Sequence, residues 1–262
     1  MKYPVRTTEI EFTSSEDTLW ELYHENSKVE KNKPFLSNEA IVKHMQAEYD
    51  SLYYPSSRLY DLSSIDLCDL GGLEAAILSR ESARSWPKIT SLNLSEIATL
   101  FSYAYGHSTA RESTDNVRYM RVCPSGGGLY PLEIFLSARN VDGLEPGLYH
   151  YNPHLDGLQQ LAEGDQTFLF SHSFIQKNVV ESAAAVWFIT AMFRRSTFKY
   201  GARGYRFSLI EAGHVAQNAN LIAASLGINV LNIGGFFDRD IDDFLKINGV
   251  DHSTIYCIAF GK

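Results

Sequence analysis

The sequence predicts an α+β fold for this chain of 262 residues. Helical and strand patterns are mixed along it without the strict alternation that builds a doubly wound sheet. A continuous apolar run at 184–192 is typical of a strand buried on both faces. The longest helical pattern follows at 206–226. Together these observations favour an α+β fold over a doubly wound one.

Two helices open the main part of the chain. The first is predicted at 73–79, and Pro87 prevents a helix from continuing through the segment that follows. The second is predicted at 94–105, where Gly106 stops it. Its apolar residues recur at helical spacing, at Leu94, Ile97, Leu100, Phe101 and Ala104.

Strand patterns dominate the middle and the end of the chain. They are predicted at 132–138, 147–151, 158–161, 184–192, 229–233 and 255–260. A short helix is expected near 241–245. Glycine at 227 ends the long helix at 206–226, whose small residues permit close backbone packing. These small residues are Ala212, Gly213, Ala216, Ala219, Ala223 and Ala224.

The first quarter of the chain differs from the rest. Residues 1–65 are polar and irregular, with one helix signal at 15–23, where Ser15 is a suitable N-cap. A stretch rich in serine, tyrosine and proline follows at 51–64. We therefore expect an N-terminal extension at 1–65 and a main domain at 66–262.

Composition excludes several classes of function. Apolar residues make up 45% of the chain, which is enough for a sizeable core, and no run approaches the length needed to span a bilayer. The N-terminus has no signal-peptide pattern, so we expect a cytoplasmic protein. A net charge of −8 without a basic cluster argues against nucleic acid as a partner. The three cysteines are far apart, which argues against disulfides and a zinc site.

A run of three glycines is the most informative local feature. Pro124 and Ser125 precede Gly126, Gly127 and Gly128, and a strand pattern follows. Glycine lacks Cβ and reaches positive φ at little cost, so its backbone can approach a flat ligand closely. A tight turn leading into a strand explains the same run. Neighbouring Cys123 is either a nucleophile or, more commonly, a small buried apolar residue.

Two further segments have the chemistry of a binding site. Arg80, Ser82 and Arg84 are spaced by two, so in an extended backbone they share one side and can converge on a phosphate. A solvated, charged loop is the alternative. Gly234 and Gly235 follow a strand and offer a second place where backbone can approach a planar group, although a β-bulge would also explain them.

Lys199 and Tyr200 form the candidate catalytic pair. An ammonium close to a phenol stabilises the phenolate, so such a pair can supply a proton acceptor. Neighbours on a helix point about 100° apart, so both reach one substrate atom only where a helix has ended. A basic surface loop is the alternative. Glu211 and His214, three residues apart on one helix face, are expected to form a structural hydrogen-bonding pair.

Taken in order, these segments resemble the flavin-dependent nitroreductase superfamily, and within it the SagB-type dehydrogenases, which include azoline oxidases of the microcin B17 type. The resemblance covers about 66–262. It rests on the Arg-x-Ser-x-Arg segment at 80–84, the segments at 124–133, 147–151 and 199–206, and the Glu-Ala-Gly-His segment at 211–214. Residues 23–28 also resemble the extension of SagB-type members.

The resemblance implies a nitroreductase-like, FMN-binding α+β fold with a mostly antiparallel central sheet, working as an intertwined homodimer. Arg80, Ser82 and Arg84 would hold the phosphate and ribityl chain of FMN. The segment Pro124, Ser125, Gly126 and Gly127 would approach the isoalloxazine from the other subunit, and Gly234 and Gly235 from the same subunit as the arginines. The helix at 206–226 would lie at the core of the dimer, which would explain its alanines.

The chemistry implied by the resemblance is oxidation of peptide thiazolines or oxazolines to thiazoles or oxazoles, with Lys199 and Tyr200 as the catalytic residues. A cyclodehydratase complex, acting on a ribosomal precursor peptide, would supply the azoline. Two alternatives remain open. One is another SagB-type redox reaction, on a carrier-bound substrate or a dehydroamino acid. The other is a scaffold of a modification complex that has lost FMN.

Overall fold

A computed structural model describes residues 23, 37–47, 51–83, 90–108 and 120–262, and it confirms the α+β class. Seven strands form one sheet in the order β1-β6-β5-β3-β7-β9-β8, and each neighbouring pair is antiparallel. The strands are β1 (Leu59–Asp61), β3 (Leu132–Ala138), β5 (Gly147–Asn152), β6 (Gly157–Glu163), β7 (Ala185–Met192), β8 (Asn229–Ile233) and β9 (His252–Gly261). Two short strands, β2 (Leu92–Asn93) and β4 (Val141–Asp142), pair in parallel beside it.

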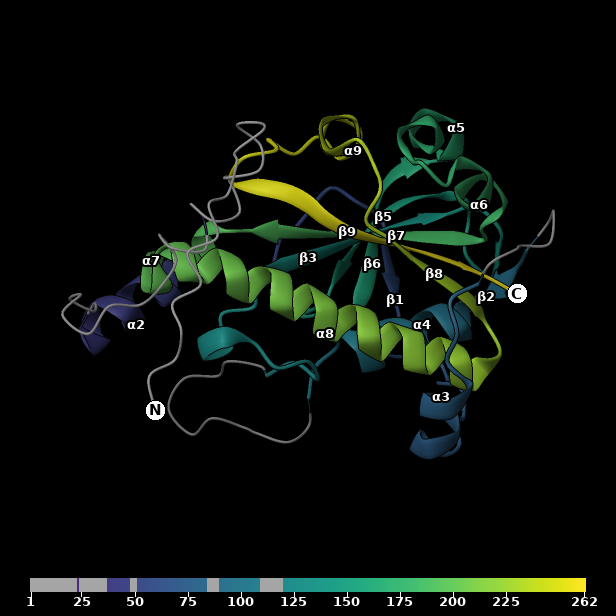
Figure 1. The fold of residues 1–262 in the computed structure, drawn as a ribbon, viewed down its shortest axis with the longest axis horizontal. Coiled ribbons are helices and arrows are strands. Elements are labelled where there is room, and N and C mark those ends of the chain that lie inside the picture. The colour runs from purple at the N-terminus through teal and green to yellow at the C-terminus, as the bar shows by residue number, and fades with distance from the viewer. Residues whose placement is uncertain (1–22, 24–36, 48–50, 84–89, 109–119) are drawn as a thin grey trace, which may run out of the picture.

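Helices cover both faces of the sheet (Figure 1). The long helix α8 and the helix α4 lie on one face, and α5, α6 and α9 lie on the other. The helices are α2 (Asn38–Ala47), α3 (Leu73–Ser79), α4 (Leu94–Ala104), α5 (Thr167–Phe170), α6 (Lys177–Ser182), α7 (Arg194–Tyr200), α8 (Ala202–Leu226) and α9 (Asp238–Leu245). Among the described residues, no helix has the length and apolar character needed to cross a membrane.

Strand β7 is the centre of the core, and its burial on both faces confirms the expectation from its apolar run. Its residues alternate between two hydrophobic clusters, as the period of two along a strand requires. Trp187 faces the cluster beneath α4 and α8, where its ring stacks on Phe101 at 4.4 Å between centroids. Phe188 faces the cluster beneath α5 and α9 and packs on Phe170 at 5.1 Å.

Helix α4 begins with a capping box. The Asn93 side chain accepts the Glu96 backbone N–H at 2.9 Å, and the Glu96 carboxylate accepts the Asn93 N–H at 3.0 Å. These two bonds satisfy backbone donors that the first turn of a helix leaves without partners. The helix ends at Ala104, within one residue of the predicted end.

The alanine-rich face of α8 corrects one expectation. Ala212, Ala216, Ala219 and Ala223 are buried in the core of their own chain, so a dimer interface does not explain them. Small side chains there let the helix backbone approach the sheet closely. Exposed residues occupy the opposite side of the helix, including Leu209 and Ile210, and Gly213, where a Cβ would meet open space.

Other predicted elements agree with the structure within a few residues. Helix α3 has its predicted bounds, and α8 begins four residues before the predicted 206. Helix α7 was not predicted. The helix signal at 15–23 lies outside the described residues except for Tyr23. Strand β1 lies inside the predicted extension and adds an edge strand to the sheet beside β6.

Candidate active site

The glycine run forms a tight 3₁₀ turn, η1 (Gly126–Gly128), directly before β3. Gly127 and Gly128 both have positive φ, at 69° and 64°, which L side chains rarely adopt. The Ser125 hydroxyl oxygen accepts the Tyr130 backbone N–H at 2.9 Å and closes the turn. Because the turn is partly exposed, its backbone is accessible from solvent.

Lys199 and Tyr200 converge on this turn within one chain. A Cβ on Gly127 would lie 2.5 Å from the Tyr200 hydroxyl oxygen and 3.1 Å from the Lys199 Nζ. Both side chains reach one place because α7 ends at Tyr200, where Gly201 has φ 56° and ψ −142° and turns the chain into α8. The condition set by helix geometry, that the helix ends at this pair, is therefore met.

Phe207, on the first part of α8, forms a third side of this site. Its ring lies 5.0 Å from the Tyr200 ring, edge to face. A Cβ on Gly126 would come within 2.9 Å of the Phe207 ring. Gly126 and Gly127 thus make room for Phe207 and Tyr200, a packing role that a simple turn does not require. The sequence analysis did not single out Phe207, and its place directly after the cluster at 199–206 was the available signal.

Glu211 lies in the buried wall behind the turn. Its carboxylate accepts the Tyr105 hydroxyl at 3.4 Å, and the side chain is 1% exposed. Burial raises the pKa of Glu211 to about 7, although hydrogen bonds from Ser125 and Tyr105 and the charge of Arg121 oppose the shift. The expected hydrogen-bonded pair of Glu211 and His214 is wrong, since His214 is exposed while Glu211 points into the core.

The raised pKa of Glu211 predicts a pH-dependent stability. The pKa lies above the usual 4.5, so the folded state binds this proton more tightly than the unfolded chain. The resulting stabilisation is complete below about pH 4.5 and is lost as pH rises through about 7. Glu211→Gln stays neutral. The free energy of unfolding of the variant and of the wild type is measured by urea titration at each pH. From pH 5 to pH 8, the difference between them should change in favour of the variant by up to about 3 kcal/mol.

The exposed Glu163→Gln is the matched control for this measurement, and it should follow the wild type at both pH values. If the Glu211→Gln and wild-type stabilities run parallel between pH 5 and pH 8, Glu211 does not titrate in this range.

Cys123 lies beside the turn but is not a nucleophile by this geometry. Its side chain is 1% exposed, and burial raises the pKa of its thiol far above the usual value. It packs in the apolar cluster beneath α4 and α8. The alternative of a small buried apolar residue is therefore the one that its surroundings support.

The residues expected at a phosphate lie elsewhere, beside β8. Arg80 caps the end of α3 with an extended backbone, Ser82 is exposed, and the Ala83 N–H donates to the Val230 carbonyl at 2.9 Å. Arg84 lies outside the described residues. Gly234 follows the end of β8, is exposed, and has open space where a Cβ would be. A Cβ on Gly235 would lie 2.9 Å from Ile175.

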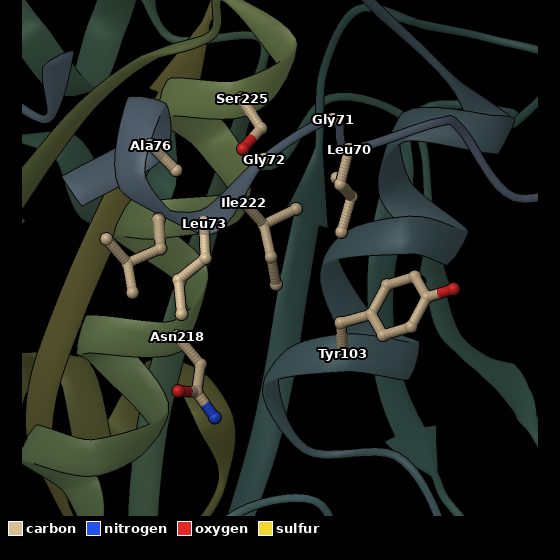
Figure 2. A pocket seen from close by; sticks show the side chains of 10 residues that line it. Leu70, Gly71, Gly72, Leu73, Ala76, Tyr103, Asn218, Ile222 and Ser225 are labelled. Carbon is tan, nitrogen blue, oxygen red and sulfur yellow. The ribbon is translucent and has the colours of Figure 1, made fainter. Parts of the chain in front are cut away.

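These two groups of residues pack against opposite ends of α8. The glycine turn contacts Phe207, whereas α3 packs beside Ile222, and fifteen helical residues span about 22 Å. Figure 2 shows a pocket of about 270 Å³ between α3, α4 and the C-terminal part of α8. Its lining is mostly apolar and includes Leu73 of α3 and Ile222 of α8. Within one chain, the structure does not bring Arg80 to Lys199 and Tyr200.

In the described part of the chain, no group of three or more histidine, cysteine, aspartate and glutamate side chains is placed to hold a metal ion. The sequence analysis did not predict the buried polar network that Glu133, His150 and Arg195 form. Glu133 and His150 fall in segments that carry the family resemblance, and a carboxylate inside an apolar strand was the available signal.

Comparisons with known proteins agree with this fold. The model of the nitroreductase family matches residues 77–262. The candidate nitroreductase MJ1384 of Methanocaldococcus jannaschii is 34% identical over 175 residues, which cover 67% of this chain and 84% of that protein. The microcin B17-processing protein McbC of Escherichia coli is 34% identical over 153 residues, covering 56% of this chain and 54% of McbC.

Two solved structures have the same fold. A candidate nitroreductase of Anabaena variabilis superimposes with a TM-score of 0.66 at 24% identity, covering 89% of this chain and 49% of that one. A chain of the E. coli microcin synthetase McbBCD complex, solved with truncated pro-MccB17 bound, superimposes with a TM-score of 0.58 at 23% identity, covering 94% and 92%. The matched segments thus cover about half of the McbC sequence and about half of the Anabaena chain. The match of the family model over most of the sequence shows that the chain belongs to the nitroreductase family.

Proposed function

We propose that this oxidoreductase of the nitroreductase family is an FMN-dependent dehydrogenase that oxidises thiazoline or oxazoline rings of a ribosomal precursor peptide to thiazoles or oxazoles. The observation that carries the proposal is the convergence of the Lys199 Nζ and the Tyr200 hydroxyl over Gly127. A phenol beside an ammonium suits proton abstraction from a ring carbon, a step that a simple flavin reductase does not need. Similarity to McbC, a microcin-processing protein, supports the same substrate class.

The residues near β8 suit the cofactor. Arg80 offers a partly exposed guanidinium and Ser82 an exposed hydroxyl, both of which bind phosphate well. The open space at Gly234 lets a planar group approach the backbone there. The glycine turn packs at Phe207, whereas α3, which precedes Arg80, packs beside Ile222, about 22 Å further along α8. We therefore assign the turn to the site of the other subunit in a homodimer. The exposed Leu209 and Ile210 of α8 suit a second copy of the chain.

In the proposed reaction, bound FMN supplies the hydride acceptor. The Lys199 ammonium stabilises Tyr200 as a phenolate, and the phenolate oxygen takes the proton from the ring carbon and becomes the neutral hydroxyl. The ring loses one proton and one hydride, two hydrogen atoms in all, and becomes aromatic. Because Gly126 and Gly127 have no side chains, the Phe207 ring, the Tyr200 hydroxyl and the Lys199 ammonium can lie directly against the backbone of the turn. Phe207 supports the Tyr200 ring from behind.

The precursor peptide is proposed to reach this site within a modification complex. The McbBCD structure contains truncated pro-MccB17, and its matching chain has this fold. We therefore propose a cyclodehydratase complex as the partner, because an enzyme that closes azoline rings must supply the substrate. O₂ would be the simplest acceptor of the two electrons from the reduced cofactor and would then be converted to peroxide.

The proposed function is tested in two steps. The purified protein, incubated with FMN and desalted, should show flavin absorbance. It should then convert an azoline-containing peptide to a product lighter by two hydrogen atoms per ring in mass spectrometry, while the same peptide with intact cysteine and serine stays unchanged. Absence of flavin bands after reconstitution would contradict both enzymatic alternatives and favour a scaffold. Flavin binding with an unchanged azoline peptide would favour another redox substrate.

A further inference from the structure

The predicted N-terminal extension contacts both α7, which carries Lys199 and Tyr200, and the first turn of α8. The Tyr23 ring packs on the Tyr205 ring at 5.3 Å, and its hydroxyl donates to the Ala202 carbonyl at 3.4 Å. Helix α2 lies beside α7 (Figure 1). The ring of His44 on α2 is 4.9 Å from the ring of Phe198 on α7, measured between centroids. These contacts lie on both sides of the catalytic pair along the chain.

The same extension reaches α7 a second time, from inside the protein, through Glu133 of β3. The Leu52 backbone N–H donates to the Glu133 Oε1 at 3.0 Å, and the Ser51 hydroxyl donates to Oε2 at 3.4 Å. The guanidinium of Arg195, in the first turn of α7, donates to Oε1. Glu133 and Arg195 are 1% and 4% exposed, so this carboxylate joins the extension to α7 in the absence of solvent.

Glu133 is held as a carboxylate by its partners. His150 Nε2 lies 2.6 Å from the Glu133 Oε2 and adds a further hydrogen bond. Burial opposes ionisation, but Arg195 and His150 outweigh it and hold the pKa of Glu133 well below its usual range. Each oxygen of the Glu133 carboxylate has at least two hydrogen-bond partners. Because the network is buried, solvent cannot readily replace a partner that a substitution removes.

Such a pair is poor evidence for stability, since well-packed apolar residues replace buried ion pairs at little cost or with a gain. Its position argues for another role. A helix of seven residues is too short to be stable alone, so its direction depends on tertiary anchors. Arg194, the neighbouring anchor, pairs with Asp251 at 3.0 Å, but those side chains are 76% and 48% exposed. Exposed pairs hold geometry weakly.

We propose that the ion pair of Glu133 and Arg195, with residues 51–52 docked on it, is a positioning device that fixes α7 and holds Lys199 and Tyr200 over Gly127. Glu133 and Arg195 are positioning residues, which act through α7 and touch no reacting atom. The catalytic meaning of this inference rests on the proposed function, whereas the placement of Tyr200 does not. The predicted extension would then be part of the catalytic machinery and not an appendage.

The test places 3-fluorotyrosine at position 200 and records its ¹⁹F resonance. The double variant Glu133→Gln, Arg195→Met removes both charges of this ion pair, while the glutamine carbonyl oxygen still accepts from the Leu52 backbone N–H. We expect a shifted or split ¹⁹F resonance, because Tyr200 loses its fixed place beside Gly127. Turnover of an azoline peptide should fall by about 10²-fold in kcat with a nearly unchanged KM, as a misplacement of about 1 Å can cause.

Arg194→Gln is the matched control, since it breaks the exposed pair one residue away on the same helix. It should keep the wild-type resonance and turnover. Arg195→Lys, which retains the cation but not the forked geometry, should change both readouts in the same direction by a smaller amount, about tenfold in kcat. It keeps the test decisive if the double variant does not fold.

A wild-type ¹⁹F resonance in the folded Arg195 variants overturns the proposal. So does an equal change in Arg194→Gln, because any loss of a surface anchor would then have the same effect. A different outcome would contradict the proposed function without contradicting the positioning role. If Tyr200→Phe retains full turnover while the ¹⁹F resonance still depends on Arg195, the positioning device stands and the role of Tyr200 as the base does not.

Discussion

Replacing Tyr200 with phenylalanine should reduce kcat for azoline oxidation by about 10²–10⁴-fold, the usual contribution of a positioned proton acceptor. The substitution removes one oxygen atom from the site and leaves the ring, which packs on Phe207 at 5.0 Å. We therefore expect FMN binding and thermal stability to stay close to wild type. Steady-state turnover by mass spectrometry, together with the flavin absorbance and a melting curve, measures all three.

Tyr205→Phe is the matched control for this substitution. Tyr205 is the other phenol of the basic cluster, and its ring packs on Phe193 at 4.8 Å, away from the glycine turn. This variant should retain turnover within about twofold, as surface substitutions usually have small effects. Equal losses in Tyr200→Phe and Tyr205→Phe would indicate damage to packing, and full turnover in Tyr200→Phe would contradict its role as the base.

After Tyr200→Phe, the largest loss is expected for Gly127→Ala. Its turnover should be lower by about 10²-fold, and less FMN should be retained after desalting. A Cβ at this position meets the Tyr200 hydroxyl oxygen at 2.5 Å and the Lys199 Nζ at 3.1 Å. It also forces alanine into a φ of 69°, at a cost of about 1–2 kcal/mol. Because the turn is partly exposed, the side chains can move away and the fold is retained.

Gly128→Ala distinguishes the effect of backbone strain in the turn from the effect of a Cβ that contacts Tyr200. It imposes almost the same backbone cost, at φ 64°, but its Cβ meets only the Met120 side chain, at 3.9 Å and beyond. Turnover in this variant should exceed that of Gly127→Ala by at least about tenfold, measured on the same peptide. If both variants lose turnover equally, backbone strain in the turn is the cause and the approach of Tyr200 is not.

Much of the fold could be predicted because local patterns report it directly. The apolar run of β7 and the strand pattern of β3 mark buried strands, and α3 was predicted with its observed bounds. Helix α7 was missed because it is only seven residues long and charged, so no apolar periodicity marks it. The role of the alanines in α8 was mistaken because small residues suit both a dimer interface and close packing within one chain.

The candidate site could likewise be predicted only in part from the sequence. Residue types and their order identified Lys199 and Tyr200, the glycine turn and the Arg80 segment, because each carries its chemistry in a short motif. The partners of these residues carry no such local mark. Glu133 and Arg195 are ordinary charged residues in the sequence, and only burial makes their pairing informative. Glu211 was noticed but given the wrong partner, since a shared helix face does not tell which side is buried.

The sequence by itself determined the fold class, most strands and helices, and the set of chemical groups available to the site. These depend on local periodicity and on residue type. Tertiary structure alone decided that Tyr200 and Lys199 meet Gly127 within one chain, while Arg80 lies at the other end of α8. Such contacts join residues far apart in the chain. They depend on how the helices pack on the sheet, which no short segment encodes.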